Sequence, residues 1–206
     1  DPEKVKIEII KTSGDKFLDT SLSKIGGKGL FTKEIQQALI DKRIDIAVHS
    51  MKDVETDLPE KLVISTILKR EDVRDSFISR RYSSIADLPL GSVVGTSSLR
   101  RKAQLLNKRK DLKVVEFRGN VQKRLEKLDN NVAVATFLAT AGLNRLGLVE
   151  LINPISTDEM LPAVAQGAVG IEHLRSEKME EFLAPLNDSV SKKRVEAERA
   201  FLRELD

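Results

Sequence analysis

Residues 93–106 read VVGTSSLRRKAQLL, and this stretch decides the predicted fold. Two β-branched residues enter a turn of glycine and hydroxyl-bearing residues, after which Leu99, Ala103 and Leu106 share one face of a helix. A strand that passes through a short turn into a helix is the repeating unit of α/β folds with parallel strands. We therefore expect an α/β fold.

The same order of elements recurs toward the C-terminus. A strand at 114–117 precedes a helix with Val121, Leu125 and Leu128 on one face. Residues 132–138 are nearly all apolar, which is typical of a strand buried on both faces. In the first third, the predicted elements are a half-buried strand at Val5, Ile7 and Ile9, a helix with Thr32 as its N-cap, and apolar strands at 44–48 and 62–68.

This alternation predicts two α/β lobes with mainly parallel sheets. The expected domains are 1–70 with 165–187 as the first lobe, 71–164 as the second lobe, and 188–206 as the first helix of a third, α+β domain. The chain would cross between the lobes near 69–75 and 163–175. The last helix ends without Gly or Pro and the chain starts without Met, so we expect a segment of a longer protein.

Composition excludes several classes of site. The 206 residues contain no Cys and two His, which argues against disulfides and against zinc sites within this stretch. No run approaches the roughly 18 apolar residues of a membrane span. A net charge of +3 and few aromatic residues argue against nucleic acid as a partner, a hypothesis that would require binding to weaken steeply with salt.

Arginines gather where the predicted strands end, the usual place for ligands in open α/β sheets. The turn at 95–98 offers N–H groups and hydroxyls to an anion. Arg100 and Arg101 lie in the first turn of the next helix, where the helix dipole disfavours cations by about 0.3–1 kcal/mol each. Arg118, Arg124 and Arg145 follow the later strands. Each could be a solvated surface residue, but together they indicate a pocket for a small polyanion.

Asp53 is the exception in this basic region. Lys52 beside it would keep the carboxylate ionised. An ionised Asp53 could stabilise positive charge on a substrate. The simpler interpretation is a loop aspartate that pairs with Lys52. We interpret His49 as structural. The loop at 24–29 lacks the spacing of a Walker motif, so it is either a crude phosphate cradle or a mobile lid.

Several of these stretches together resemble the porphobilinogen deaminase (hydroxymethylbilane synthase) family, in its order and spacing. They are VHSMKD at 48–53, GTSSLRR at 95–101, FRGN at 117–120 and ATAGLNRLG at 139–147, with GGKGLF at 26–31 and ERAFL at 198–202. The resemblance covers essentially the whole chain.

The resemblance implies lobes like those of periplasmic binding proteins. It also implies a transferase that joins four porphobilinogen units head to tail, with loss of ammonia, into hydroxymethylbilane on a covalently attached dipyrromethane primer. By position, Asp53 would be catalytic. The implied cofactor-binding residues are Lys52, Thr96, Ser97, Ser98, Arg100 and Arg101. The implied substrate-binding residues are Arg118, Arg124, Arg145 and Gln166, and the implied lid lysines are Lys24 and Lys28.

The chain departs from the family pattern in three respects. The primer-bearing cysteine would lie beyond Asp206, so the 206 residues alone would be inactive. Ala165 stands where the family usually has glycine, which makes the backbone near Gln166 uncertain, and Val54-Glu55 replaces the usual Val-Pro or Leu-Pro.

We further expect a cytoplasmic monomer without nucleic-acid or membrane partners. A two-lobed sensor of small carboxylates is the alternative, but it gives Asp53 no purpose.

Overall fold

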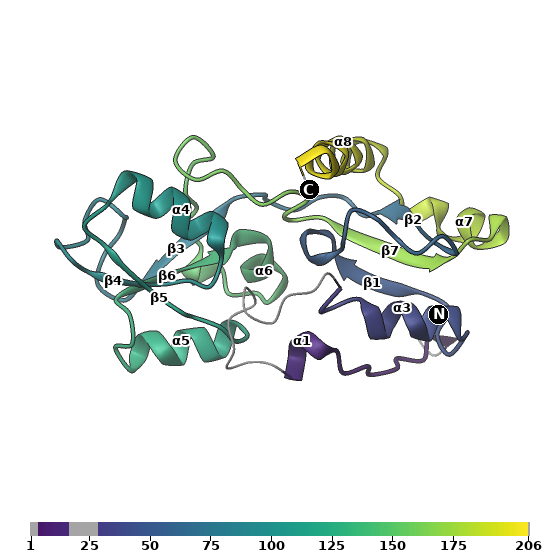
Figure 1. The fold of residues 1–206 in the computed structure, drawn as a ribbon, viewed down its shortest axis with the longest axis horizontal. Helices are drawn as coiled ribbons and strands as arrows, with labels where there is room; N and C mark the ends of the chain where they lie inside the picture. Colours follow the sequence, from purple (N-terminus) through teal and green to yellow (C-terminus); the bar gives the residue numbers. More distant parts are fainter. Residues whose placement is uncertain (1–3, 17–28, 206) are drawn as a thin grey trace. The chain divides into compact units, whose positions relative to one another are not determined.

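A computed structural model describes residues 4–16 and 29–205 of the chain, which form two compact units (Figure 1). Among the described residues, unit 1 holds 4–16, 29–70 and 168–205, and unit 2 holds 71–167. The chain therefore passes between the units at 70–71 and at 167–168.

Unit 1 is built on a three-stranded sheet of order β1-β7-β2. Its elements are α1 (Ser13–Lys16), α3 (Lys33–Ile40), β1 (Ala47–Ser50), the 3-10 helix η2 (Met51–Asp53), β2 (Leu62–Ile67), β7 (Val169–Leu174), α7 (Glu177–Leu183), the 3-10 helix η4 (Ala184–Leu186) and α8 (Ser189–Leu205). Helix α3 packs on the sheet through Leu39, which contacts Ala47 and Leu62 in the buried core.

Unit 2 is built on a four-stranded sheet of order β3-β6-β4-β5. Its elements are β3 (Asp75–Ser79), β4 (Val93–Gly95), α4 (Leu99–Lys108), β5 (Lys113–Val115), α5 (Val121–Asp129), β6 (Ala135–Ala139), α6 (Thr140–Arg145) and the 3-10 helix η3 (Val149–Leu151). Alternate residues of a strand point to opposite faces of the sheet. In this sheet they are buried on both faces, in two separate apolar cores. Phe77 and Phe137 join Leu105 of α4 in one core, and Ile78 and Leu138 join residues of α5 and α6 in the other.

The α/β class is confirmed, but the strand directions are more mixed than the sequence predicted. In unit 2, β4 pairs in parallel with β5 and β6, as expected, whereas β3 pairs antiparallel with β6. In unit 1, β7 pairs antiparallel with both β1 and β2. The topology explains this difference: β2 precedes the excursion of the chain into unit 2 and β7 follows it, so the two strands run in opposite directions.

Two local predictions are wrong. Residues 5–12 form no strand, and Val5, Ile7 and Ile9 are each at least 67 % exposed, because no neighbouring strand covers them in the described structure. The predicted inward face of α4 is also displaced: Leu99 is 71 % exposed, while Arg101 and Leu105 point inward. Arg101 can point inward because its guanidinium group pairs with the buried carboxylate of Asp75.

Candidate functional site

The candidate catalytic aspartate of unit 1 stands directly after β1, an edge strand of the three-stranded sheet. Strand β1 leads into η2, where Met51 is buried and its N–H donates to the Ala168 carbonyl at 3.0 Å. A Cβ atom at Gly170 would come within 2.2 Å of the Met51 sulfur, so the glycine makes room for this side chain. The seating of Met51 places Asp53 at the exposed end of the 3-10 turn.

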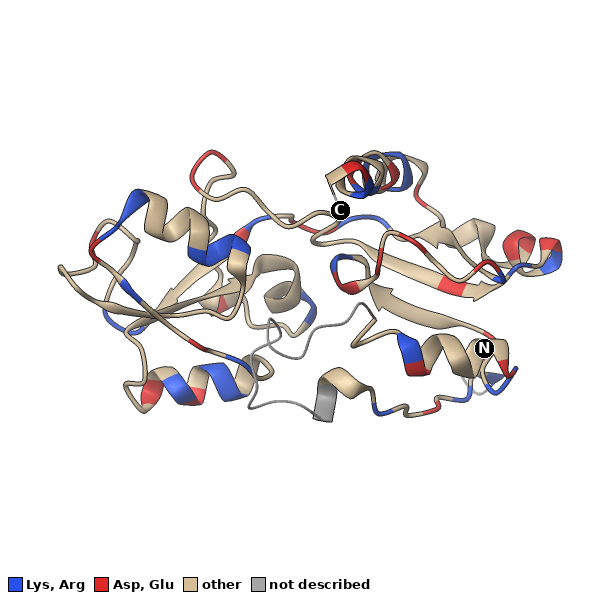
Figure 2. Ribbon diagram, viewed as in Figure 1, with Lys and Arg blue, Asp and Glu red and all other residues tan. Residues whose placement is uncertain are grey.

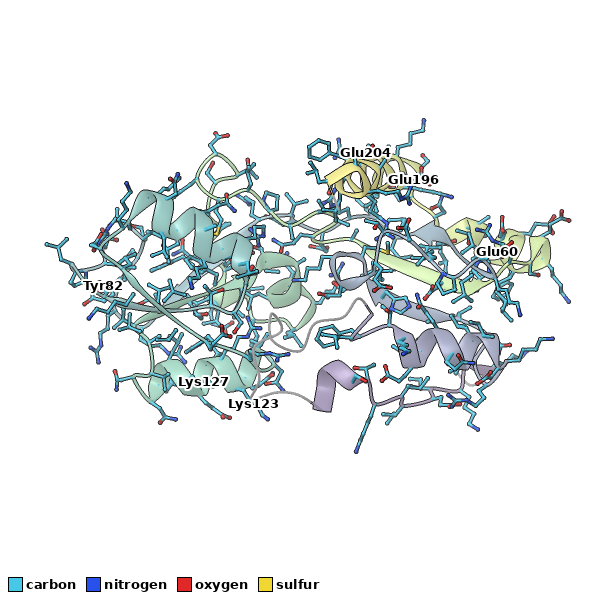
Figure 3. The ribbon with its side chains drawn as sticks, in the orientation of Figure 1. Glu60, Tyr82, Lys123, Lys127, Glu196 and Glu204 are labelled. Atoms are coloured by element: carbon cyan, nitrogen blue, oxygen red, sulfur yellow. The ribbon has the colours of Figure 1, made fainter. Side chains whose placement is uncertain are left out.

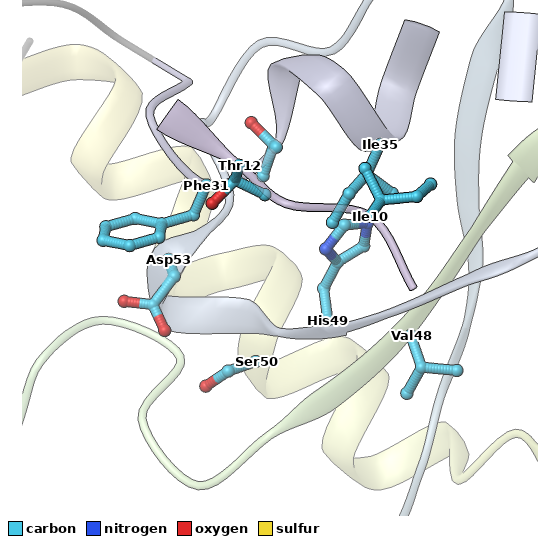
Figure 4. A pocket seen from close by; sticks show the side chains of 9 residues that line it. Ile10, Thr12, Phe31, Ile35, Val48, His49, Ser50 and Asp53 are labelled. Atoms are coloured by element: carbon cyan, nitrogen blue, oxygen red, sulfur yellow. The ribbon is translucent and has the colours of Figure 1, made fainter. Parts of the chain in front are cut away.

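Asp53 lines a pocket of about 340 Å³ in unit 1 (Figure 4). Figure 4 shows Asp53 and Phe31 on one side of this pocket and the His49 ring with Ile10 and Ile35 on the other. The remaining lining residues are Thr12, Thr32, Val48 and Ser50. Among the described lining residues, Asp53 supplies the one carboxylate, so the pocket combines an acceptor of hydrogen bonds with apolar surface.

The protein around Asp53 changes its acidity. Loss of hydration raises the pKa of this carboxyl above its ordinary value of 3.8, although Lys52, a hydrogen bond from Ser50 and the nearby His49 each lower it. The side chain still reaches water at the mouth of the pocket. The result is a carboxylate that is less well solvated than a surface aspartate and therefore interacts more strongly with a positive group.

A buried polar network lies behind the pocket. Glu172 on β7 is fully buried and accepts hydrogen bonds from Gln36 of α3 at 3.0 Å, while His49 of β1 lies 2.9 Å from its other oxygen. Three elements of unit 1 thus meet at one carboxylate. This arrangement agrees with a structural interpretation of His49, whose partner Glu172 lies too far along the chain to be recognised from local sequence.

The loop after Asp53 is held by arginines of α8. Arg199 donates to the carbonyls of Val54, at 2.8 Å, and of Glu55, and Arg203 donates to the Thr56 carbonyl at 3.0 Å. Carbonyl acceptors in a loop are otherwise satisfied by water, so these bonds fix the backbone next to Asp53. The resemblance did not point to this role for α8.

In unit 2, the first residue of the turn at 95–98 is a glycine because the Phe117 ring packs directly against it. A Cβ atom on Gly95 would lie 2.3 Å from the Phe117 ring, which is fully buried. The three hydroxyls of the turn accept hydrogen bonds from the backbone: Thr96 from Ser98, Ser97 from Phe117, and Ser98 from Arg101 as the N-cap of α4. Each hydroxyl hydrogen can therefore still be donated to another group.

Arg100 and Arg101 converge on one buried acid, Asp75 at the start of β3. Arg101 Nη2 lies 2.6 Å from Asp75 Oδ1, and Arg100 Nη2 lies 2.7 Å from Oδ2. Asp75 is 0 % exposed and Arg101 only 6 %. Burial raises the pKa of Asp75, but the charges and hydrogen bonds of the two guanidinium groups outweigh it and hold the pKa below its ordinary value. No apolar pattern in the sequence predicted Asp75 as a site residue, because the strand that it begins starts with this buried acid.

A second group of guanidinium charges forms around Arg124 on α5. Desolvation, Arg101 and Arg118 all lower the pKa of Arg124, to about 10. Arg124 Nε donates to the Gly119 carbonyl at 2.9 Å, which fixes its direction. Figure 2 shows basic residues in blue along the ribbon of α5, and Figure 3 labels Lys123 and Lys127 on the same helix. Three guanidinium groups that repel one another favour an anionic ligand.

Gln166 and Arg145 lie where the chain leaves unit 2. Gln166 Nε2 donates to Asp75 Oδ1 at 3.0 Å and to the Val73 carbonyl at 2.8 Å, and Arg145 Nη2 donates to the Gly167 carbonyl at 2.9 Å. Ala165 is buried with a φ angle of 57°, in the left-handed region where glycine is favoured. This geometry explains why a glycine suits the position.

The predicted site residues thus fall into two sets. Asp53 and Lys52 belong to unit 1, and the turn at 95–98, the arginines and Gln166 belong to unit 2, where Asp75 joins Arg100, Arg101 and Gln166. Lys24 and Lys28 lie outside the described residues. In the part of the chain that the structure describes, no cluster of His, Cys, Asp or Glu is suited to a metal, and no helix is long and apolar enough to cross a membrane.

Solved structures with the same fold support the architecture. Lipoprotein Tp32 from Treponema pallidum superimposes with a TM-score of 0.51 at 13 % identity, covering 80 % of each chain. The protein is accordingly an α/β protein of the two-lobed class to which the periplasmic binding proteins belong.

Sequence comparisons define the family. Residues 1–181 match the family described as porphobilinogen deaminase, dipyromethane cofactor binding domain. The chain is 58 % identical to the porphobilinogen deaminase of Paracoccus denitrificans and 57 % identical to the chloroplastic enzyme of Pisum sativum, in each case over 98 % of its length. It belongs to the porphobilinogen deaminase family. The chain spans 65 % and 56 % of the length of these two relatives.

Proposed function

We propose that the protein containing this chain is a transferase that joins four porphobilinogen units head to tail into hydroxymethylbilane, with release of ammonia, in tetrapyrrole biosynthesis. The observation that carries the proposal is the group of guanidinium charges on unit 2. The pKa of Arg124 is lowered to about 10 by burial and by Arg101 and Arg118, so positive charge is in excess there. The acidic arms of pyrroles would offset this charge.

A dipyrromethane primer fits the chemistry of the same residues. One Asp75 carboxylate faces two guanidinium groups, so Arg100 and Arg101 retain one net positive charge for a ligand. The primer's acetate and propionate groups would be held by Lys52, Thr96, Ser97, Ser98, Arg100 and Arg101, and its attachment would be to a Cys beyond residue 206. When bound, such a primer supplies the pyrrole to which substrate units are added.

Asp53 would act on the substrate through its charge. A carboxylate in the unit 1 pocket can accept hydrogen bonds from pyrrole N–H groups and stabilise the positive charge that develops when the amine of porphobilinogen departs. Its reduced hydration strengthens this effect, since the interaction is less screened than in bulk water.

Arg118, Arg124, Arg145 and Gln166 would bind the incoming porphobilinogen and the growing chain. The arginines supply charge-assisted hydrogen bonds worth about 1.5–3 kcal/mol each, so a few suffice for micromolar affinity. We also propose that the protein is a monomer, that it has no nucleic-acid or membrane partner, and that it acts in the cytoplasm. The relative from Pisum sativum is described as chloroplastic.

Incubation of the full-length protein with porphobilinogen tests the proposal. The wild type should release ammonia, whereas a carboxylate sensor, the alternative function, would leave the compound unchanged. Asp53→Asn should slow release by about 100- to 1000-fold, because the change removes a charge that stabilises the transition state. Asp57→Asn is a matched control, since Asp57 is an exposed aspartate on the same loop. Equal rates in the two variants would remove Asp53 from the mechanism.

A further inference from the structure

Asp75 has no role in the proposed chemistry, yet it contacts three of the proposed ligand-binding residues. Its carboxylate accepts hydrogen bonds from Arg100 Nη2 at 2.7 Å, Arg101 Nη2 at 2.6 Å, Arg101 Nε at 3.2 Å and Gln166 Nε2 at 3.0 Å. These donors come from the first turn of α4 and from the segment that leaves unit 2. One fully buried side chain therefore fixes two separate parts of the candidate site.

The bonds leave both guanidinium groups able to bind a further anion. An arginine has five N–H donors in a planar arrangement. Arg101 uses two of them on Asp75 and one on the Phe137 carbonyl, and Arg100 uses one on Asp75 and one on the Leu161 carbonyl. Donors remain on each, and their directions are set by the bonds already made.

The charge balance points in the same direction. A single carboxylate offsets one of two positive charges, which makes it possible to bury Arg101 at the N-terminal end of a helix, where the helix dipole opposes a cation. Without Asp75, Arg101 would be a buried charge without its partner and would be expected to turn toward water. The acid thus determines where the guanidinium groups point.

We propose that Asp75 is a positioning residue that holds Arg100 and Arg101 in the orientation in which they bind the carboxylates of the primer. The ligand in this proposal rests on the proposed function. The orientation itself rests on the contacts within unit 2. Asp75 would touch neither primer nor substrate, so its effect would be transmitted through the arginines and through Gln166.

The test uses the full-length protein prepared without primer and then incubated with porphobilinogen, with primer attachment followed by intact mass. Asp75→Asn should acquire the primer on the order of 100-fold more slowly than wild type, because misplacing binding groups by about 1 Å can cost that factor. The control is Asp72→Asn, which also removes a carboxylate from an arginine, Arg74, in the same segment. A folded Asp75→Asn protein that acquires primer as fast as Asp72→Asn would overturn the proposal.

A second measurement covers the case in which Asp75→Asn does not fold. The Arg101 Nε–H, which donates to Asp75, should exchange slowly with solvent in the wild type and should remain slow in Asp72→Asn. Fast exchange in the wild type would contradict the positioning role. If wild-type protein neither carries a primer nor releases ammonia, the proposed function is wrong, and the exchange of this N–H still decides whether Asp75 orients Arg101.

Discussion

At the scale of single residues, the acidity of Asp53 has a direct consequence for activity. The proposed role requires the ionised carboxylate, and reduced hydration raises its pKa above 3.8. The rate of ammonia release should therefore fall as the pH is lowered through a value above 3.8. A pH–rate profile measures this limb, and a profile that stays flat down to pH values near 3.8 would contradict the assignment.

The same pKa makes a prediction about stability. A raised pKa means that the folded protein binds the proton more tightly than the unfolded chain, so the ionised Asp53 opposes folding at neutral pH. Asp53→Asn should consequently unfold at a higher denaturant concentration than wild type at pH 7. The difference should disappear as the pH falls below 3.8, where both states carry the proton.

Ala165 is a position where backbone geometry limits the side chain. Its φ of 57° lies in the left-handed region, which costs a non-glycine residue about 1–2 kcal/mol. Ala165→Gly should change the free energy of unfolding by less than about 1 kcal/mol, because relief of strain is offset by the flexibility gained in the unfolded chain. Ala165→Val should cost at least about 2 kcal/mol, since a larger, β-branched side chain adds strain and crowding at a fully buried site. Denaturant unfolding distinguishes the two variants.

At the scale of secondary-structure elements, α8 stabilises the loop that follows Asp53. Arg199 is partly buried and donates to successive backbone carbonyls of this loop. Arg199→Met should keep the packing of the stem but lose the hydrogen bonds, so amide exchange at residues 54–57 should become faster and stability should fall by about 1–2 kcal/mol. Lys193→Met, an exposed change on the same helix, is the control. Unchanged exchange in the Arg199 variant would show that the loop holds itself in place.

The sequence predicted those elements whose apolar pattern is complete within a short stretch. Strand β6 and helix α5 formed where the runs at 132–138 and 121–128 indicated. The alternation at Val5, Ile7 and Ile9 failed, because a period of two specifies the faces of a strand but not the partner strand that would pair with it. Strand β3 begins with Asp75, and a buried acid conceals a strand from any apolar pattern.

The candidate site was predictable to the extent that its residues follow strand ends. Local sequence places Asp53 after β1 and the arginines after β4 and β5. It does not show that Arg101 meets Asp75, 26 residues earlier in the chain, or that His49 meets Glu172, 123 residues later. Such pairs depend on which strands become neighbours, which is a property of the whole sheet.

At the scale of the whole molecule, the net charge of +3 conceals a strong local asymmetry. Unit 2 gathers guanidinium groups around Arg124, while unit 1 offers the carboxylate of Asp53 at a pocket. The two units therefore differ in the charge that each offers to a ligand.

The intact mass of the full-length protein is the most direct test of this account. We predict a mass that exceeds the polypeptide by one covalently bound dipyrromethane, and this excess should be lost when the cysteine proposed to carry the primer is replaced by serine. A full-length wild-type protein that has the mass of its polypeptide alone, even after incubation with porphobilinogen, would contradict the account.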